Sequence, residues 1–212
     1  MFANALEKEI VETVAAATVE ALGPGAKPDA IPALLTELVA VAEGILEHQA
    51  PPERPLDCRS GCNHCCRAPV EVTAPEVLAL AAALLKRPKG LADLVEPEPR
   101  CPLLDRDGLC AVYDSRPFFC RANNSMDVAA CERGTDVPIW PARWSVHRHI
   151  QGGLLFGIAE LGHEADRLDL RPAIAIALSE PRAAERWLAG ERLFESALLP
   201  SGTRWLNILQ GR

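Results

Sequence analysis

All eight cysteines of the chain fall within residues 58–131, and four of them lie within nine positions. In chain order they are Cys58, Cys62, Cys65, Cys66, Cys101, Cys110, Cys120 and Cys131. Thiolates at such spacing are the usual ligands of zinc and of iron–sulfur clusters, because a C-x2-C pair lets two sulfurs from one turn reach one ion. We therefore predict that thiolates from the stretches 58–66 and 101–131 together bind a metal ion or cluster.

Two other interpretations of the cysteines stay open. They can be small buried hydrophobes, although the polar neighbours Arg59, Asn63 and His64 do not fit an apolar core. They can also form a disulfide framework, which is rare in the cytosol. Consecutive side chains diverge, so Cys65 and Cys66 are not expected to bind the same ion. Eight thiolates then make either two four-ligand sites or one site plus reactive thiols.

Composition limits the classes of function. The chain has 212 residues, of which 49% are hydrophobic, so it can build a core. Its formal net charge is −7, which lacks the excess of cations that sequence-independent nucleic-acid binding needs. No apolar run approaches the roughly 20 residues of a membrane span, and the acidic start at Glu7 and Glu9 does not resemble a signal peptide. We expect a cytoplasmic protein with no nucleic-acid or membrane partner.

The elements that must position the thiols are predicted to be helices. Apolar residues at helical spacing predict a helix around Leu6–Ala17 and another over 31–46, with Asp29 as its N-cap. A third helix follows the capping box Thr73-Ala74-Pro75-Glu76. Strand signals are weak. After Pro141, helical segments are expected near 145–162, 170–179, 181–190 and 191–199.

The predicted fold class is mostly α, with helices flanking an irregular cysteine-rich metal-binding module. Residues 1–50 are expected to form a helical hairpin, 51–141 the cysteine module, and 142–212 helices that pack on it, all in one compact unit. Gly153 and Gly157 lie at helical spacing and permit a close helix approach. We expect the four tryptophans to pack between helices. The four are Trp140, Trp144, Trp187 and Trp205.

Three further residues are predicted to support a bound metal or cluster. Arg116 and Arg121 flank Cys120, and their guanidinium groups can offset the negative charge of a thiolate site by hydrogen bonding to sulfur. Tyr113 follows Cys110 by three residues and either donates its hydroxyl to the site or packs its ring locally. His64 is expected mainly to face solvent rather than to bind the metal.

Three stretches together resemble a known family. They are Cys58 to Cys66, Val72-Thr73-Ala74-Pro75-Glu76-Val77, and Cys101 to Arg121 with its Cys110-Ala-Val-Tyr113 and Arg116-Pro117-Phe-Phe-Cys120 segments. The pattern resembles the CxxCxxCC family, the YkgJ-like group of zinc- or iron-chelating bacterial proteins that are often labelled iron–sulfur oxidoreductases. One gap differs: three residues separate Cys58 from Cys62, where the family usually has two. A flagellin lysine methylase is similar in its cysteine motif, which implies a protein-modifying role.

We therefore expect a metal-binding cysteine-cluster protein. It would hold an iron–sulfur cluster, with 4Fe-4S favoured over Zn²⁺, for a redox or protein-modifying role. Such a protein is an iron–sulfur oxidoreductase component that meets a protein partner or protein substrate. The alternative is a structural zinc-binding protein that serves as a partner-interaction module. The sequence identifies no catalytic residue.

Overall fold

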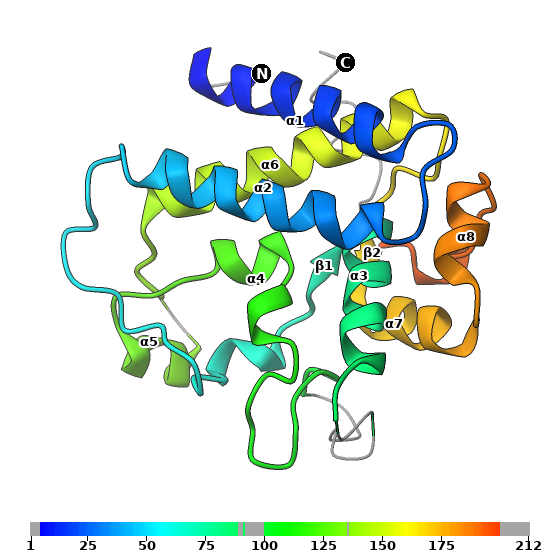
Figure 1. Ribbon diagram of the computed structural model, residues 1–212. Coiled ribbons are helices and arrows are strands. Elements are labelled where there is room, and N and C mark those ends of the chain that lie inside the picture. The colour runs from blue at the N-terminus through cyan, green and yellow to red at the C-terminus, as the bar shows by residue number, and fades with distance from the viewer. Residues whose placement is uncertain (1–4, 89–90, 92–99, 135, 200–212) are drawn as a thin grey trace.

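The computed structural model describes residues 5–88, 91, 100–134 and 136–199. This part of the chain is mostly α-helical, as predicted, with eight α-helices, three short 3-10 turns and one two-stranded sheet (Figure 1). In chain order the elements are α1 (Ala5–Leu22), α2 (Ala30–Leu46), η1 (His64–Arg67), β1 (Glu71–Val72), α3 (Ala74–Leu85), η2 (Tyr113–Ser115), α4 (Phe118–Ala122), α5 (Val128–Arg133), α6 (Pro141–Glu160), β2 (Leu168–Asp169), α7 (Leu170–Ser179), α8 (Ala183–Leu188) and η3 (Glu195–Ala197).

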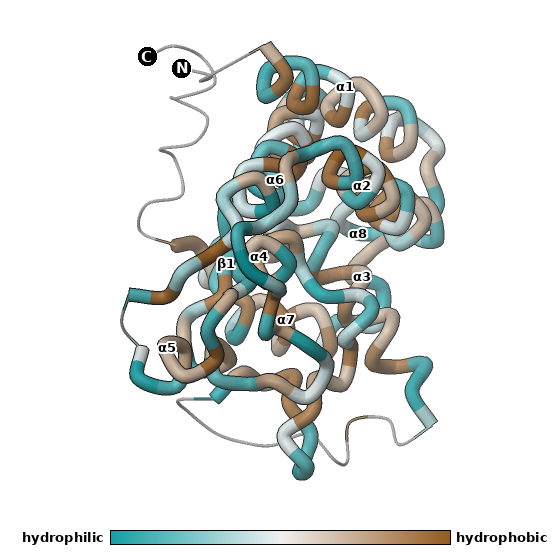
Figure 2. The backbone as a smooth tube through the Cα atoms, turned by 90° about the vertical axis from the view of Figure 1, so that its left-hand side faces the viewer, coloured by the Kyte–Doolittle hydropathy of each residue, from teal (hydrophilic) through white to brown (hydrophobic). Residues whose placement is uncertain are grey.

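The three longest helices, α1, α2 and α6, gather at one end of the molecule, and the short elements lie at the other (Figures 1 and 2). Helices α1 and α2 run in opposite directions, and α1 packs mainly on α6. Helix α3 lies between α2 and α7. The cysteine-bearing loops and the short helices α4 and α5 therefore rest on a helical scaffold.

Helices α1 and α6 approach closely because α6 carries glycines where they meet. A Cβ atom on Gly153 would lie 2.7 Å from the carbonyl oxygen of Val11, and one on Gly157 would lie 2.6 Å from that of Ala15. Neither position can accept a Cβ atom without a shift of α1, because the atoms in its way belong to the backbone of α1. The predicted close helix approach at these two glycines is confirmed.

A small antiparallel sheet joins the cysteine module to the C-terminal helices. Strand β1 pairs with β2 in the register Glu71 with Asp169 and Val72 with Leu168. The carboxylate of Glu71 forms ion pairs with Arg148 of α6 and, at 2.7 Å, with Arg167. Because all three charged side chains are largely buried, the segment that follows the first cysteines is fixed to two distant parts of the chain.

One hydrophobic cluster extends through α1, α2, α3, α6 and α7. Trp187 of α8 is completely buried at its edge, which agrees with its predicted packing role. Trp140 packs against the same cluster, and Trp144 contacts the ring of Phe119 at 6.2 Å between centroids. Trp205 lies outside the described residues. None of the described helices has the length and apolar character that a membrane crossing requires.

Two local predictions differ from the structure. The helix expected near 191–199 is wrong, because only the turn Glu195–Ala197 forms there. Phe194 is fully buried, and the chain then extends so that Leu198 bridges to Leu168 and the Leu199 N–H donates to the Arg167 carbonyl. Tertiary pairing thus overrides a local helical pattern. Asp29 marks the start of α2, but its side chain makes no capping hydrogen bond.

The contact of α6 with α1 gives a stability prediction. Replacing Gly157 by alanine forces a Cβ into the backbone of α1, so we expect the free energy of unfolding to fall by about 1–3 kcal/mol. The matched control is Gly44→Ala in α2, where nothing lies within 4 Å of the added Cβ. There the higher helix propensity of alanine should stabilise the protein by up to about 1 kcal/mol. Urea unfolding followed by circular dichroism measures both, and equal effects would contradict the packing argument.

Candidate metal centre

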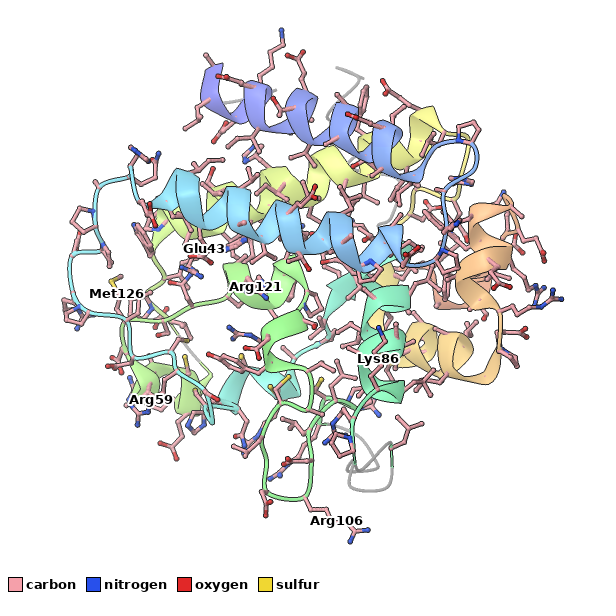
Figure 3. The ribbon with its side chains drawn as sticks, viewed as in Figure 1. Glu43, Arg59, Lys86, Arg106, Arg121 and Met126 are labelled. Carbon is pink, nitrogen blue, oxygen red and sulfur yellow. The ribbon has the colours of Figure 1, made fainter. Side chains whose placement is uncertain are left out.

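All eight cysteines are free thiols, so the disulfide interpretation is not borne out. They lie on loops and short helical pieces that gather at one end of the molecule, where Figure 3 shows their sulfur atoms around α4, α5 and η1. The first stretch supplies Cys65 and Cys66 from η1, and the second supplies Cys120 from α4 and Cys131 from α5. The two stretches therefore come together in space, as predicted.

Seven of the thiols line one cavity of about 130 Å³, which we call the inner cavity. Its other walls are mainly apolar and include Leu103, Leu104, Phe119 and Leu170. The seven cysteines around it are Cys58, Cys62, Cys65, Cys66, Cys101, Cys110 and Cys120. The inner cavity is thus a sulfur-rich space with mainly apolar walls at the base of the helical scaffold.

A second and larger cavity of about 680 Å³, the outer cavity, lies against the first. Its cysteines are Cys58, Cys62, Cys65 and Cys131, so three thiols border both spaces. Its remaining walls are more polar and include His64, Asn123 and Ser125. Cys65 is the one exposed cysteine, which places it at the open side of the cluster.

A tight turn shapes the first cysteine stretch. The Cys62 N–H donates to the Arg59 carbonyl at 3.1 Å, and Gly61 takes a φ of +91° that other residues rarely adopt. The backbone N–H of Ser125 donates to the Cys58 sulfur at 3.1 Å. The longer gap between Cys58 and Cys62 is therefore absorbed by a glycine turn, and Cys58 still reaches the second stretch.

The loop between Cys101 and Cys110 is held by its aspartate. One carboxylate oxygen of Asp105 accepts from the N–H groups of Asp107 at 3.0 Å and Leu109 at 2.8 Å. The Cys101 N–H donates to the Cys66 carbonyl at 2.7 Å. The turn at Asp105, Asp107 and Gly108 brings Cys101 and Cys110 to the same cavity.

Gly108 ties this loop to the first cysteine stretch. Its carbonyl accepts a hydrogen bond from the Asn63 side-chain amide at 2.9 Å, and a Cβ on Gly108 would lie 2.6 Å from that amide nitrogen. Because Asn63 precedes η1, this contact fixes the loop relative to Cys65 and Cys66.

Helix α4 is positioned by a buried carboxyl group that the sequence analysis assigned only to the capping box. Glu76 is 3% exposed, and its two oxygens accept from the Thr73 N–H at 2.7 Å, the Phe118 N–H at 2.7 Å and the Gln151 amide at 3.2 Å. Burial raises the pKa of Glu76, and these hydrogen bonds oppose the rise. The start of α4, and with it Cys120, is thus anchored to α3 and α6.

Burial and hydrogen bonding also set the protonation state of the thiols. Loss of solvent raises the pKa of Cys101 to about 11 and raises those of Cys110 and Cys120. A hydrogen bond from the Cys66 thiol lowers the pKa of Cys65 to about 6 and raises that of Cys66. A metal that binds Cys101, Cys110 and Cys120 must therefore displace protons from these thiols, which burial keeps neutral.

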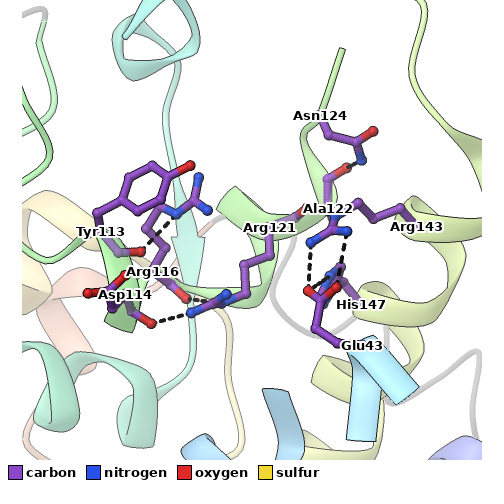
Figure 4. A network of polar contacts seen from close by, with 9 residues as sticks. All are labelled: Glu43, Tyr113, Asp114, Arg116, Arg121, Ala122, Asn124, Arg143 and His147. Atoms are coloured by element: carbon purple, nitrogen blue, oxygen red, sulfur yellow. Dashed lines mark hydrogen bonds and ion pairs between the residues drawn. The ribbon is translucent and has the colours of Figure 1, made fainter. Parts of the chain in front are cut away.

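The three residues predicted to support a bound metal do not all face the inner cavity. Arg116 and Tyr113 line the inner cavity, and the guanidinium carbon of Arg116 stacks 3.6 Å from the centre of the Tyr113 ring. The charge of Arg116 acts on Cys65, Cys110 and Cys120. Arg121 points elsewhere: it donates to the carbonyl groups of Arg116 and Asp114 and lines a neighbouring cavity (Figure 4).

The donor set of the centre fits soft metals. Within the described residues, no three His, Cys, Asp or Glu side chains are placed close enough to hold a single ion as they stand. The inner cavity nevertheless presents thiols from four separate segments with a cationic side chain beside them. Sulfur ligands of this number select zinc or iron–sulfur clusters over magnesium and calcium, which prefer oxygen.

A buried histidine lies beside this network. His147 of α6 is completely buried, and its Nε2 atom is 3.8 Å from the Glu43 carboxylate, which pairs with Arg143 at 2.6 Å (Figure 4). Burial and the charges of nearby arginines lower the pKa of His147 to about 3. Because Glu43 is already paired with Arg143, its carboxylate does not stabilise the protonated form of His147. His147 is thus a buried structural residue.

Comparison with family models gives one match, which lies over the cysteine module. The family model CxxCxxCC, described as "Putative zinc- or iron-chelating domain", matches residues 57–138. This segment contains every cysteine of the chain. No curated protein and no solved structure matched the chain.

The anchoring of α4 by Glu76 can be tested. Glu76→Ala leaves the buried N–H of Phe118 and the Gln151 amide without an acceptor, so we expect the free energy of unfolding to fall by about 2–4 kcal/mol. Glu76→Gln keeps one carbonyl oxygen and should lie between wild type and alanine. The control Glu37→Ala on the exposed side of α2 should change little. Urea unfolding measures all three, and a mild effect of Glu76→Ala would refute the anchor.

His147 predicts an acid-sensitive stability. Its pKa is lowered from 6.5 to about 3 in the fold, so the unfolded chain binds the proton first. The contribution of the neutral ring is full above pH 6.5 and is lost as the pH falls from 6.5 to about 3, at about 1.4 kcal/mol per pH unit. His147→Gln should flatten this part of the profile. The free energy of unfolding of wild type and His147→Gln, measured from pH 3 to 6.5, tests this. Parallel pH profiles for the two proteins would contradict the prediction.

Proposed function

We propose that the cysteine module, which matches the zinc- or iron-chelating family model over residues 57–138, holds an iron–sulfur cluster in its inner cavity, with [4Fe–4S] favoured. The observation that carries the proposal is the cavity itself, because thiols from four segments surround it together with Arg116. When bound, the cluster would supply one-electron chemistry.

Four thiols are assigned to the cluster. Three of them, Cys101, Cys110 and Cys120, line the inner cavity and not the outer one. Cys66 is the fourth, because it too lines the inner cavity and not the outer one. Four cysteine ligands are what a [4Fe–4S] cluster requires.

The other four thiols form a second group around the outer cavity. The titration of Cys58 is linked to Cys62, Cys65 and Cys131, and all four border that space. The adjacent residues Cys65 and Cys66 thereby fall in different groups, in keeping with the divergence of consecutive side chains. We assign this outer group to a second metal ion or to redox-active thiols.

The shape of the inner cavity favours a cluster over a single zinc ion. Four thiolates that bind zinc at about 2.3 Å enclose the ion with no space between them. A cluster needs room among the cysteines for its own iron and sulfide atoms. A cavity of about 130 Å³ with mainly apolar walls provides that room. The positive charge of Arg116 beside three of the thiols would offset the negative charge of a thiolate-ligated cluster.

A redox or protein-modifying role follows from this assignment. The outer cavity is wide, and the exposed Cys65 lies between it and the inner cavity. A protein partner or protein substrate that docks there would come close to the cluster. We propose the cytoplasm as the compartment, since glutathione there keeps thiols reduced and able to bind metal.

Structural zinc is the alternative, with the helices as a partner-interaction surface. The outer group supports it, because Cys58, Cys62, Cys65 and Cys131 provide four thiolates near the surface. In that case the metal would replace the core that the irregular loops lack.

Anaerobic purification tests the proposal. We expect brown protein with absorbance near 400 nm and about four iron and four sulfide per chain. Cys120→Ser should remove most of this absorbance, whereas Cys131→Ser, the matched control in the outer group, should retain it. Colourless protein with stoichiometric zinc in wild type would overturn the cluster in favour of structural zinc. Equal loss in both variants would overturn the division into two groups.

A further inference from the structure

A third cavity lies on the other side of Arg116 and Pro117 from the inner cavity. It has a volume of about 300 Å³ and lies between α2, α3 and the segment 114–121, so we call it the α2–α3–α4 cavity. Part of its wall is apolar and is formed by Pro32, Leu35, Val39, Ala79 and Ala83. Its volume is at the lower end of the range for small-molecule sites.

Cationic side chains border the rest of this cavity. Arg116, Arg121 and Lys86 all line it, and Figure 3 shows Arg121 and Lys86 on the same side of the molecule below α2. Two of these come from the segment that follows Cys110, and Lys86 comes from the end of α3. The positive charges therefore converge on one space from two separate elements.

The two arginines have backbone partners in place of carboxylates. Arg121 donates through Nε to the Arg116 carbonyl at 3.0 Å and also to the Asp114 carbonyl. Arg116 donates through Nε to the Tyr113 carbonyl at 2.9 Å. Neither forms an ion pair with a carboxylate of the described residues, unlike Arg143, which pairs with Glu43. These carbonyl contacts hold the guanidinium groups in place without cancelling their charge.

The two carboxyl groups in the lining do not neutralise the cavity. Glu76 already accepts hydrogen bonds from Thr73, Phe118 and Gln151, and burial raises its pKa. Asp114 is exposed at the rim, as Lys86 is, so water screens both of these charges, although the Asp114 carboxylate still acts on Arg121. With three cationic side chains against two carboxyl groups, the lining keeps a net positive charge beside an apolar wall.

We propose that the α2–α3–α4 cavity binds a small organic acid. Its carboxylate would meet Arg121 and Lys86, because charge-assisted hydrogen bonds to guanidinium and ammonium groups are strong where water is partly excluded. Its apolar body would lie on Leu35, Val39 and Ala83. The ligand would then be next to the thiol centre across Arg116 and Pro117. The proposal does not depend on which metal the thiols bind.

Calorimetric titration of the full chain with octanoate tests this site. We expect a Kd below about 1 mM, with at least tenfold weaker binding of octanol and octylamine, which share the apolar body but lack the negative charge. Octyl phosphate should also bind more weakly than octanoate. Octanol binding as tightly as octanoate, or octyl phosphate binding more tightly, would overturn the assignment of a carboxylate ligand.

Variants locate the ligand within the fold. Lys86→Gln and Arg121→Gln should each weaken octanoate binding at least fivefold, and Arg121→Lys should recover part of the loss. Ala83→Phe should block the cavity without changing any charge. Arg182→Gln is the charge-matched control, since its side chain is 77% exposed before α8. An unchanged Kd in both Lys86→Gln and Ala83→Phe would overturn the proposal, whatever Arg121→Gln does to folding.

Two further measurements separate this site from the metal centre. Circular dichroism and thermal unfolding confirm that each variant is folded before it is titrated. Titration before and after treatment with a chelator should give the same Kd within twofold. A Kd that rises more than tenfold on metal removal while the fold persists would mean that octanoate binds at the metal centre, which would overturn a separate site.

Discussion

The buried carboxyl group of Glu76 is the contact on which the placement of the thiols depends. It closes the first turn of α3 through Thr73, accepts the first N–H of α4 from Phe118, and accepts the Gln151 amide from α6. Removing a carboxyl group from water is costly unless hydrogen bonds replace the lost hydration. Because three elements supply those bonds, none of them can shift without leaving a buried polar group unpaired.

The cysteine module has little regular structure of its own and is shaped by its attachments. The sheet at Glu71 and Val72 holds one side of it to the C-terminal helices. The Asn63 contact to Gly108 and the Ser125 contact to Cys58 hold its two halves together. These attachments are hydrogen bonds between distant segments of the chain. A metal bound among the thiols would add to a framework that the polypeptide has already arranged.

The elements that depend on local pattern could be predicted from the sequence. The capping box at Thr73, the helices 170–179 and 30–46, and the glycine contact of α6 all follow from residues within one or two turns. The resemblance of the cysteine spacing to one family is confirmed over residues 57–138. The convergence of the two cysteine stretches on one cavity could also be predicted, because closely spaced cysteines indicate a shared centre.

Other features depend on contacts that the local sequence does not encode. The bond from Phe118 to Glu76 joins residues 42 positions apart, and nothing near either residue indicates it. The segment 191–199 has a helical pattern, but it extends where it pairs with Leu168. Arg121 follows a cysteine directly, yet carbonyl groups of the preceding turn direct its side chain away from the sulfurs. In each case, contacts that the local residue pattern does not reveal determine the conformation.

The adjacency of Cys65 and Cys66 has a mechanical consequence. Their thiols belong to different groups in our assignment, but the two residues share a single planar peptide unit. The Cys66 thiol also donates a hydrogen bond to the Cys65 sulfur, so a change in the charge or position of one sulfur acts directly on the other. The turn His64–Arg67 therefore couples the two sulfur groups.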